Sequence, residues 1–272
     1  MRLNSDAPSV VIAAGASFRY GAAPALEEAS FTIPEGAITT LIGPNGSGKS
    51  TLLHAIAGLM SPVTGTITVT AGRRIAYVLQ ATKVNEALPV TVREVVAMGR
   101  YATAGPYRRL GAADRAAVDT ALERMRITPL ARRHLRELSG GQRQRVFVAQ
   151  GIAQDHDLLL LDEPLTGLDL VSARAIDDVL HEEQQAGRTV IITSHALNEA
   201  AAGDWVILLA GRVVASGPPQ QVLTRENLAA AYGSILLHEG ERFVLEDPAH
   251  RPVPGRHEHG SRAGDGGAAV VP

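Results

Sequence analysis

The chain has 272 residues, of which 45% are hydrophobic and 20% charged, and its formal net charge at pH 7 is −2. This composition is ordinary for a globular protein with a buried core, and the charge balance gives no reason to expect nucleic-acid binding. Cysteine is absent, so the chain itself offers no disulfide and no thiolate metal site. No apolar run approaches the roughly 18 residues that cross a bilayer, so any membrane role is expected to come through a partner.

The N-terminal part of the chain predicts strands that lead into a glycine-rich loop. Residues 10–14 form a short apolar stretch, which is more typical of a first strand than of a secretory signal. Apolar and polar side chains alternate over residues 30–33, and after a Pro-Glu-Gly turn residues 37–42 predict a second strand. The loop follows directly, and beyond it apolar residues have helical spacing as far as Gly58, which suits a helix end.

The loop itself matches the G-x-x-x-x-G-K-[ST] pattern of a phosphate-binding loop, in the strand–loop–helix context that this pattern requires. Its glycines let successive backbone N–H groups turn toward phosphate oxygens beside a helix N-terminus. We expect Lys49 to reach the β- and γ-phosphates of a nucleotide and the Ser50 hydroxyl to bind Mg²⁺. The expected nucleotide ligands in this segment are Gly43, Pro44, Asn45, Gly46, Ser47, Gly48, Lys49, Ser50 and Thr51.

Further short apolar stretches, separated by turn signals, predict the rest of an α/β core. The predicted strands are residues 66–69, 74–79, 158–161, 189–193, 205–209 and 212–216, the last two joined by a turn at residues 210–211. A small hairpin is predicted within residues 235–245. Residues 248–272 are rich in Pro, Gly, His and charge, and we expect them to be a disordered tail.

Between about residues 90 and 155 the pattern becomes helical. Thr91 and Glu94 form a capping box at the start of one helix, and residues 118–125 carry the apolar face of another. We therefore expect a helical subdomain at about residues 90–155, inserted in a domain that covers residues 1–247.

Two motifs in the second half of the chain suit a phosphate site. Residues 158–161 are leucines followed by Asp162 and Glu163, as in a buried parallel strand, and ligands gather at the carboxyl ends of such strands. Residues 139–142 open a helix with small side chains, where exposed N–H groups and the positive dipole end suit an anion.

These motifs, in this order, resemble those of the ATP-binding-cassette (ABC) ATPases, and the resemblance spans about residues 9–235. It implies a RecA-like P-loop NTPase core of α/β class with a small antiparallel β subdomain and an inserted helical subdomain. In that family, the motif at residues 139–142 binds the γ-phosphate held by the phosphate-binding loop of another subunit. The resemblance therefore implies a dimer that encloses two ATP molecules.

The resemblance also implies roles for individual residues. Asp162 would hold Mg²⁺ together with Ser50 and Gln80, and Gln80 would sense the membrane partner. Glu163 would act as the general base that polarises the attacking water, while His195 would contact the γ-phosphate and orient that water. The implied catalytic set is Lys49, Gln80, Glu163 and His195.

Other positions match the ABC pattern outside this catalytic set. Tyr20 stands where an aromatic ring stacks on adenine, and Asp169 where a loop crosses the dimer interface. The implied nucleotide contacts from the helix-opening motif are Ser139, Gly140, Gly141 and Gln142. One departure is Ala196, which follows His195 where an aspartate is commoner, and we expect this missing acidic neighbour to have only a tuning effect.

Three kinds of ABC protein fit these motifs: the ATPase subunit of a transition-metal cation importer, that of a siderophore, haem or cobalamin importer, and a soluble ABC protein that transports nothing. The third is disfavoured because the sequence shows no second cassette, no long coiled-coil insertion and no strongly basic extension. Residues 165–169 read Leu-Thr-Gly-Leu-Asp, closer to the zinc and manganese group than to the Thr-Thr-x-Leu-Asp usual in siderophore and cobalamin ATPases. A metal-cation importer is therefore favoured, with zinc slightly ahead of manganese.

The resemblance implies several partners and a location. We expect a second ABC ATPase subunit, integral membrane permease subunits and, indirectly, an extracytoplasmic substrate-binding protein. The expected location is the cytoplasmic face of the cell membrane, and the expected ligands are ATP and Mg²⁺.

Overall fold

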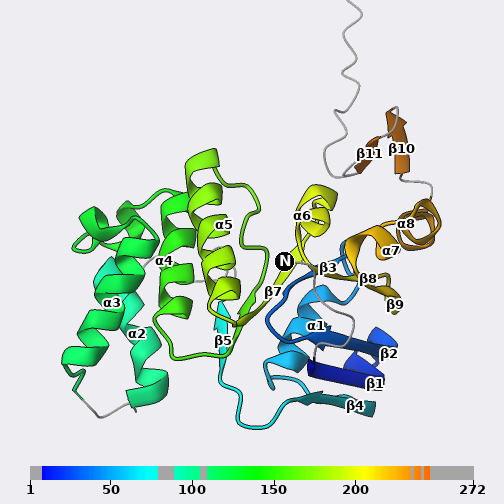
Figure 1. The fold of residues 1–272 in the computed structure, drawn as a ribbon, viewed down its shortest axis with the longest axis horizontal. Coiled ribbons are helices and arrows are strands. Elements are labelled where there is room, and N and C mark those ends of the chain that lie inside the picture. The colour runs from blue at the N-terminus through cyan, green and yellow to red at the C-terminus, as the bar shows by residue number, and fades with distance from the viewer. Residues whose placement is uncertain (1–7, 79–88, 105–108, 234–235, 240–241, 246–272) are drawn as a thin grey trace, which may run out of the picture.

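A six-stranded sheet forms the centre of the computed structural model, which describes residues 8–78, 89–104, 109–233, 236–239 and 242–245 (Figure 1). In sheet order its strands are β5 (Ile75–Val78), β6 (Leu158–Leu161), β7 (Thr189–Ser194), β3 (Ile38–Ile42), β8 (Trp205–Leu209) and β9 (Val213–Gly217). Neighbours from β5 to β8 run parallel, whereas β9 returns antiparallel beside β8. The parallel strands therefore bring their carboxyl ends to one edge of the sheet.

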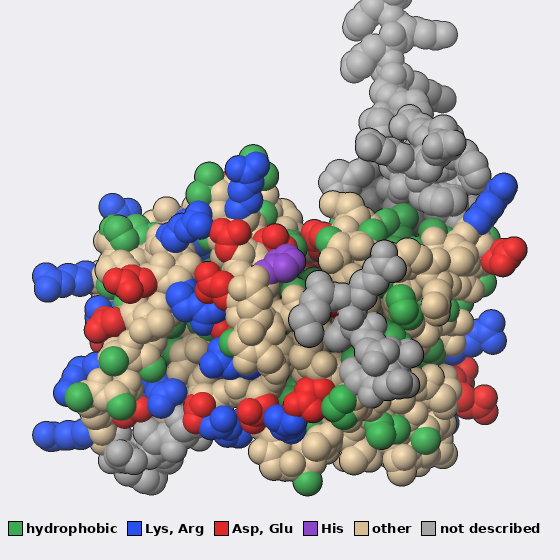
Figure 2. Space-filling view, viewed as in Figure 1, with side chains coloured by type: hydrophobic (Ala, Val, Ile, Leu, Met, Phe, Trp, Pro, Cys, Tyr) green, Lys and Arg blue, Asp and Glu red, His purple; other side chains and the backbone are tan. Residues whose placement is uncertain are grey.

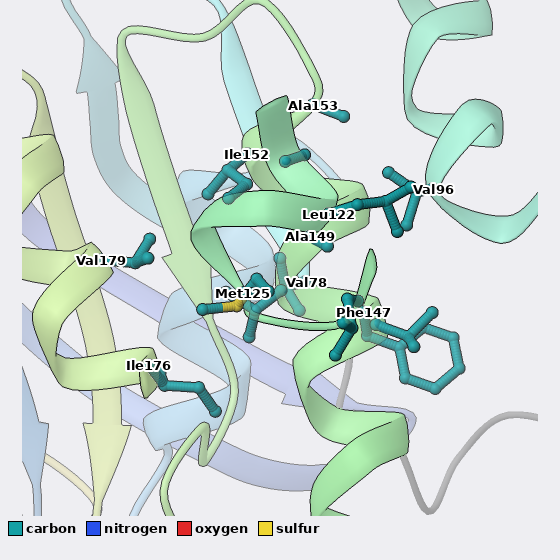
Figure 3. Close-up of a cluster of buried hydrophobic side chains, with 14 of the residues drawn as sticks. Val78, Val96, Leu122, Met125, Phe147, Ala149, Ile152, Ala153, Ile176 and Val179 are labelled. Atoms are coloured by element: carbon teal, nitrogen blue, oxygen red, sulfur yellow. The ribbon is translucent and has the colours of Figure 1, made fainter. Parts of the chain in front are cut away.

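Apolar side chains on both faces explain why the central strands are buried. Along β6, Leu159 and Leu161 join one hydrophobic cluster, whereas Leu158 and Leu160 join another on the opposite face. The first cluster includes α4 (Gly140–Ile152) and α5 (Leu170–Gln185), and Figure 3 shows side chains from several elements meeting there. The second includes α1 (Lys49–Ile56), so the sheet is covered on both sides, as a parallel sheet requires.

A three-stranded antiparallel sheet packs with α1 and confirms the small antiparallel β subdomain. Its order is β2-β1-β4, formed by β1 (Ser9–Tyr20), β2 (Ala23–Pro34) and β4 (Thr64–Val69). The β1–β2 pairing changes register on both sides of Ala16. Strand β1 extends beyond the apolar stretch at residues 10–14 that predicts it.

Helices at one end of the molecule form the predicted helical insertion, although its proposed bounds, residues 90–155, stay a prediction (Figure 1). They are α2 (Val92–Ala104), α3 (Ala112–Arg124) and α4, with 3-10 turns at Thr128–Leu130 and Leu135–Glu137. The Thr91–Glu94 capping box is present, because Thr91 N donates to Glu94 Oε2 at 2.7 Å and Glu94 N to Thr91 Oγ1 at 3.3 Å. Charges of both signs are interspersed over this end in Figure 2.

A buried carboxylate joins these helices to the sheet. The side chain of Glu183 on α5 is fully buried, and its Oε1 accepts a hydrogen bond from Arg124 Nη1 of α3 at 2.6 Å. Its Oε2 lies 2.8 Å from His156 Nε2 and accepts from Arg188 Nη1 at 2.6 Å. Burial alone raises the pKa of Glu183, but hydrogen bonds from His156, Arg188 and Arg124 outweigh it and lower that pKa to about 2.

The C-terminal part completes the fold with α6 (Leu197–Ala202), α7 (Pro219–Val222) and α8 (Arg225–Tyr232). The predicted hairpin is confirmed as β10 (Leu236–Glu239) paired antiparallel with β11 (Arg242–Leu245). The tail predicted at residues 248–272 lies outside the described residues. The predicted domain covers residues 1–247, and both of its ends also lie outside them. Within the described segments, no helix combines the length and apolar character needed to cross a membrane.

Candidate functional site

The glycine-rich loop lies where β3 ends and α1 begins, as the sequence predicts. Gly48 precedes the helix with φ 99°, a left-handed conformation that favours glycine. A Cβ added to Gly43 would lie 2.1 Å from the carbonyl oxygen of Leu209, so only glycine allows the loop to pack against β8 here. Asn45 is exposed at the tip of the loop, whereas Ser47 is buried beneath it.

Lys49 is buried and turns back over its own loop. Its Nζ donates to the carbonyl oxygen of Gly43 at 2.7 Å and to that of Pro44 at 3.1 Å. Burial lowers the pKa of Lys49, while the nearby charges of Glu163 and Asp162 act to raise it. The ammonium is therefore bonded to loop carbonyls and is influenced by the charges of two carboxylates, where the γ-phosphate of a nucleotide is expected.

Asp162 and Glu163 follow β6 at the carboxyl edge of the sheet, beside the loop. The Ser50 hydroxyl donates to Asp162 Oδ1 at 3.3 Å, which joins the first turn of α1 to this carboxylate. Thr193 Oγ1, on the neighbouring strand β7, donates to Asp162 Oδ1 at 2.9 Å and accepts from Glu163 N at 2.7 Å. Thr193 is thus a site residue that the sequence-based set lacks. The feature that could have indicated it is a polar side chain within a strand that is buried along its whole length.

Glu163 and His195 face each other across the ends of β6 and β7. Glu163 has φ 49°, a left-handed conformation that is uncommon for residues with a side chain and is often associated with functional sites. Its Oε1 pairs with His195 Nε2. The hydrogen bond from His195 is the main cause of a lowered pKa for Glu163, against the opposing effect of burial. The carboxylate is therefore held ionised, as a general base must be.

The helix-opening motif at residues 139–142 forms the N-terminus of α4. Ser139 Oγ accepts from Gln142 N at 3.3 Å, and Gln142 Oε1 accepts from Ser139 N at 3.1 Å, so the two side chains form a capping box. Ser139 and Gly140 are exposed.

Gly141 brings this motif against the start of α5. A Cβ on Gly141 would lie 2.7 Å from Asp169 Oδ2 and 2.6 Å from Ser172 Oγ. Asp169 caps α5, because its Oδ1 accepts from Ser172 N at 2.9 Å. The motif at residues 139–142 and the loop at Asp169, which the family resemblance places at a subunit interface, therefore pack against each other in one corner of the molecule.

Of three further predicted site residues, the structure describes two. Tyr20 ends β1 at the β1–β2 turn with 56% of its surface exposed, which leaves the ring free to stack on a base. Thr51 is buried in the first turn of α1. Gln80 lies outside the described residues.

The donor chemistry of the site fits both expected ligands. Ser50 Oγ and the carboxylate oxygens of Asp162 are hard oxygen donors, and Mg²⁺ prefers such ligands together with phosphate oxygens. The glycine loop, the N-terminus of α1 and the ammonium of Lys49 fit the phosphates of a nucleotide.

Sequence comparison adds a family and named relatives. The profile of the ABC transporter family matches residues 26–166. The chain is 38% identical to the manganese transport system ATP-binding protein MntB of Bacillus subtilis, over 84% of this chain and 94% of that protein. It is 40% identical to the zinc transport system ATP-binding protein TroB of Treponema pallidum, over 86% and 92%. It is 39% identical to the chelated iron transport system membrane protein YfeB of Yersinia pestis, over 79% and 75%.

Solved structures with the same fold agree with this comparison. One belongs to a transporter described as metal-chelate type, in an inward-facing conformation, with a TM-score of 0.77 and 29% identity over 89% of this chain and 99% of that one. Another is CbiO1 from Clostridium perfringens, part of the transporter complex CbiONQ, with a TM-score of 0.68 and 27% identity over 82% and 93%. The RecA-like α/β fold predicted from the sequence is thus confirmed.

Proposed function

Because this chain belongs to the ABC transporter family, we propose that it is the ATP-hydrolysing subunit of an importer for a transition-metal cation, manganese or zinc. The observation that carries the chemistry is the array at the carboxyl edge of the sheet, where Ser50 bonds to Asp162 and His195 bonds to Glu163. The relatives that transport manganese and zinc support the choice of cargo, since they match most of this chain.

The proposed mechanism uses positioning and electrostatics. Lys49 would exchange its contacts with the loop carbonyls for the β- and γ-phosphates of ATP and spread their charge. Glu163 would accept a proton from the attacking water at its carboxylate, and His195 would hold that carboxylate in place. Mg²⁺, when bound, supplies further positive charge beside the phosphates, and Ser50 and Asp162 would hold it.

A second copy of the chain would complete each site. The support is the exposed N-terminus of α4, where Ser139 and Gly140 present backbone groups that would face the γ-phosphate on the partner. Asp169 would lie beside them, at the start of α5.

Coupling to transport requires a membrane partner. We place the chain at the cytoplasmic face of the membrane, with permease subunits contacting the segment around Gln80 and an extracytoplasmic binding protein supplying the cation. The inward-facing transporter with the same fold supports association with a membrane transporter.

Chelated iron is the second candidate cargo, and one observation favours it. The relative YfeB, named for chelated iron transport, is 39% identical to this chain. The match with YfeB covers a smaller share of this chain and of the relative than the matches with MntB and TroB do. Manganese and zinc therefore remain the first choice of cargo.

Deleting the gene in its host and measuring cell-associated manganese, zinc and iron tests the cargo. We expect loss of manganese or zinc uptake, restored by the wild-type chain and not by Lys49→Ala. Lys49→Ala removes a charge-assisted contact to phosphate, so the purified variant should bind ATP about 10–100-fold more weakly. Arg225→Ala, which removes an exposed cation at the start of α8, is the matched control. Unchanged metal content in the deletion strain would contradict the proposal.

A further inference from the structure

The turn that carries His195 is held by a hydrogen-bonded carboxylate that the mechanism above does not use. Ser194, the last residue of β7, is buried with 2% of its surface exposed. Its Oγ accepts a hydrogen bond from Ala196 N at 2.9 Å and donates to Glu199 Oε2 at 2.5 Å. His195 lies between this serine and Ala196, to which the serine is bonded.

The direction of these bonds follows from what each group can donate. A hydroxyl has one proton and two lone pairs, so Ser194 can donate to the carboxylate and still accept the N–H of Ala196. Ala196 is the N-cap of α6 and has no side-chain oxygen, and Glu199 occupies the third position of the helix. In an ordinary capping box the carboxylate at that position accepts the N–H of the N-cap residue directly. Here the Ser194 hydroxyl relays that interaction.

The relay fixes the backbone on both sides of His195. The peptide after His195 is tied through Ala196 N, and the residue before it is tied to α6 through Glu199. The backbone on both sides of His195 sets where its side chain starts, and its Nε2 meets Glu163 Oε1. Loss of the relay would release the turn and let the ring move away from the carboxylate.

We propose that Glu199 is a positioning residue for ATP hydrolysis, which acts through Ser194 to aim His195 at Glu163. The inference rests on the proposed function. It also accounts for Ala196, because the acidic group expected directly after His195 is provided by Glu199, three residues further along α6.

Hydrolysis by the full chain tests the proposal with three variants. Glu199→Ala should lower kcat about 10–100-fold, as expected for a misplaced catalytic group, and leave the KM for ATP within about twofold. Glu199→Gln should recover most of the activity, because its amide oxygen can still accept from Ser194. Glu226→Ala, which removes the exposed acid in the first turn of α8, should match wild type.

The His195 ring provides a readout that does not depend on hydrolysis. Its NMR resonances, assigned by their loss in His195→Ala, should move in Glu199→Ala without nucleotide and stay in place in Glu226→Ala. Failure of the wild-type chain to hydrolyse ATP would overturn the proposed function, while these resonances would still decide the positioning role. Unchanged kcat together with unchanged His195 resonances in Glu199→Ala would overturn the inference. If that variant does not fold, Ser194→Ala breaks the same relay with the loss of one oxygen, and the same outcomes apply.

Discussion

The carboxyl edge of the sheet and the N-terminus of α4 are both proposed to meet phosphate, yet their surroundings differ. At the sheet edge, Lys49 and Asp162 are buried, and the Asp162 carboxylate accepts hydrogen bonds from Thr193 on β7 and Ser50 on α1. At α4, Ser139 and Gly140 are exposed, and the side chains of Ser139 and Gln142 each accept a hydrogen bond from the other residue's backbone N–H. The first region thus has its geometry fixed within one chain, whereas the second is rigid but faces outward. In the proposed mechanism, this difference separates residues that act within one chain from those that act on a nucleotide held by a second.

The largest effect is expected at the sheet edge, where chemistry is proposed to occur. Glu163→Gln keeps the shape of the side chain but removes its basicity, so turnover should fall about 10²–10⁴-fold while ATP binding persists. Steady-state hydrolysis and equilibrium nucleotide binding measure the two quantities. Glu123→Gln, an exposed carboxylate on α3, is the control. Near-normal hydrolysis by Glu163→Gln would exclude Glu163 as the general base.

The buried carboxylate of Glu183, which bonds to α3 and to the segments just before β6 and β7, predicts a pH effect on stability. The pKa of Glu183 falls from an ordinary 4.5 to about 2 in the fold, so its ionised form stabilises the native state. This contribution is fully present above about pH 4.5 and is lost as the pH falls toward 2, amounting to about 3 kcal/mol. Urea unfolding across that range measures it. Glu183→Gln should lose this pH dependence. If the free energy of unfolding of that variant still changes with pH as in the wild type, Glu183 is not the group responsible.

Within the corner between α4 and α5, two adjacent glycines should behave differently. Gly141→Ala places a methyl group within 2.7 Å of Asp169 Oδ2, and such overpacking costs about 1–3 kcal/mol of stability. Gly140→Ala meets nothing within 4 Å, so it should leave the melting temperature unchanged or slightly raised. Thermal unfolding of both variants tests the contrast. Equal stabilities would show that α4 and α5 are not tightly packed at Gly141.

The smallest effect is expected at Tyr20, whose ring is exposed in this structure. Tyr20→Ala removes a proposed stacking surface, and aromatic pairs contribute about 0.5–1.5 kcal/mol, so ATP affinity should fall about 2–10-fold. Tyr20→Phe keeps the ring and should keep the affinity. Equal affinities for the Ala variant and wild type would remove Tyr20 from the nucleotide site.

Motifs with local spacing were the predictable part of this molecule. The loop around Lys49 and the carboxylates after β6 follow from short patterns, because each is formed by consecutive residues. Helix α5 is absent from the sequence-based predictions, although Asp169 is a good cap and buried residues such as Ile176 and Val179 recur at helical spacing. Hairpin β1–β2 is only partly predicted, since register shifts around Ala16 break the alternation.

Long-range contacts were the unpredictable part. Thr193 joins Asp162 and Glu163 only because β6 and β7 are neighbours in the sheet, and the residues are 30 or 31 positions apart in sequence. Glu199 is close to His195 in sequence, but its link to Ser194 depends on how the chain turns from β7 into α6. No period in the sequence encodes either contact.

The Lys49 ammonium, already bonded to two carbonyl oxygens of its own loop, has a consequence for nucleotide exchange. In the proposed mechanism, a phosphate that enters this loop would replace the two carbonyl oxygens as partner of the ammonium. When the product leaves, the same carbonyl oxygens would bond to the ammonium again. The loop would thus supply ready partners for the ammonium in the empty site, which would favour product release after each proposed cycle.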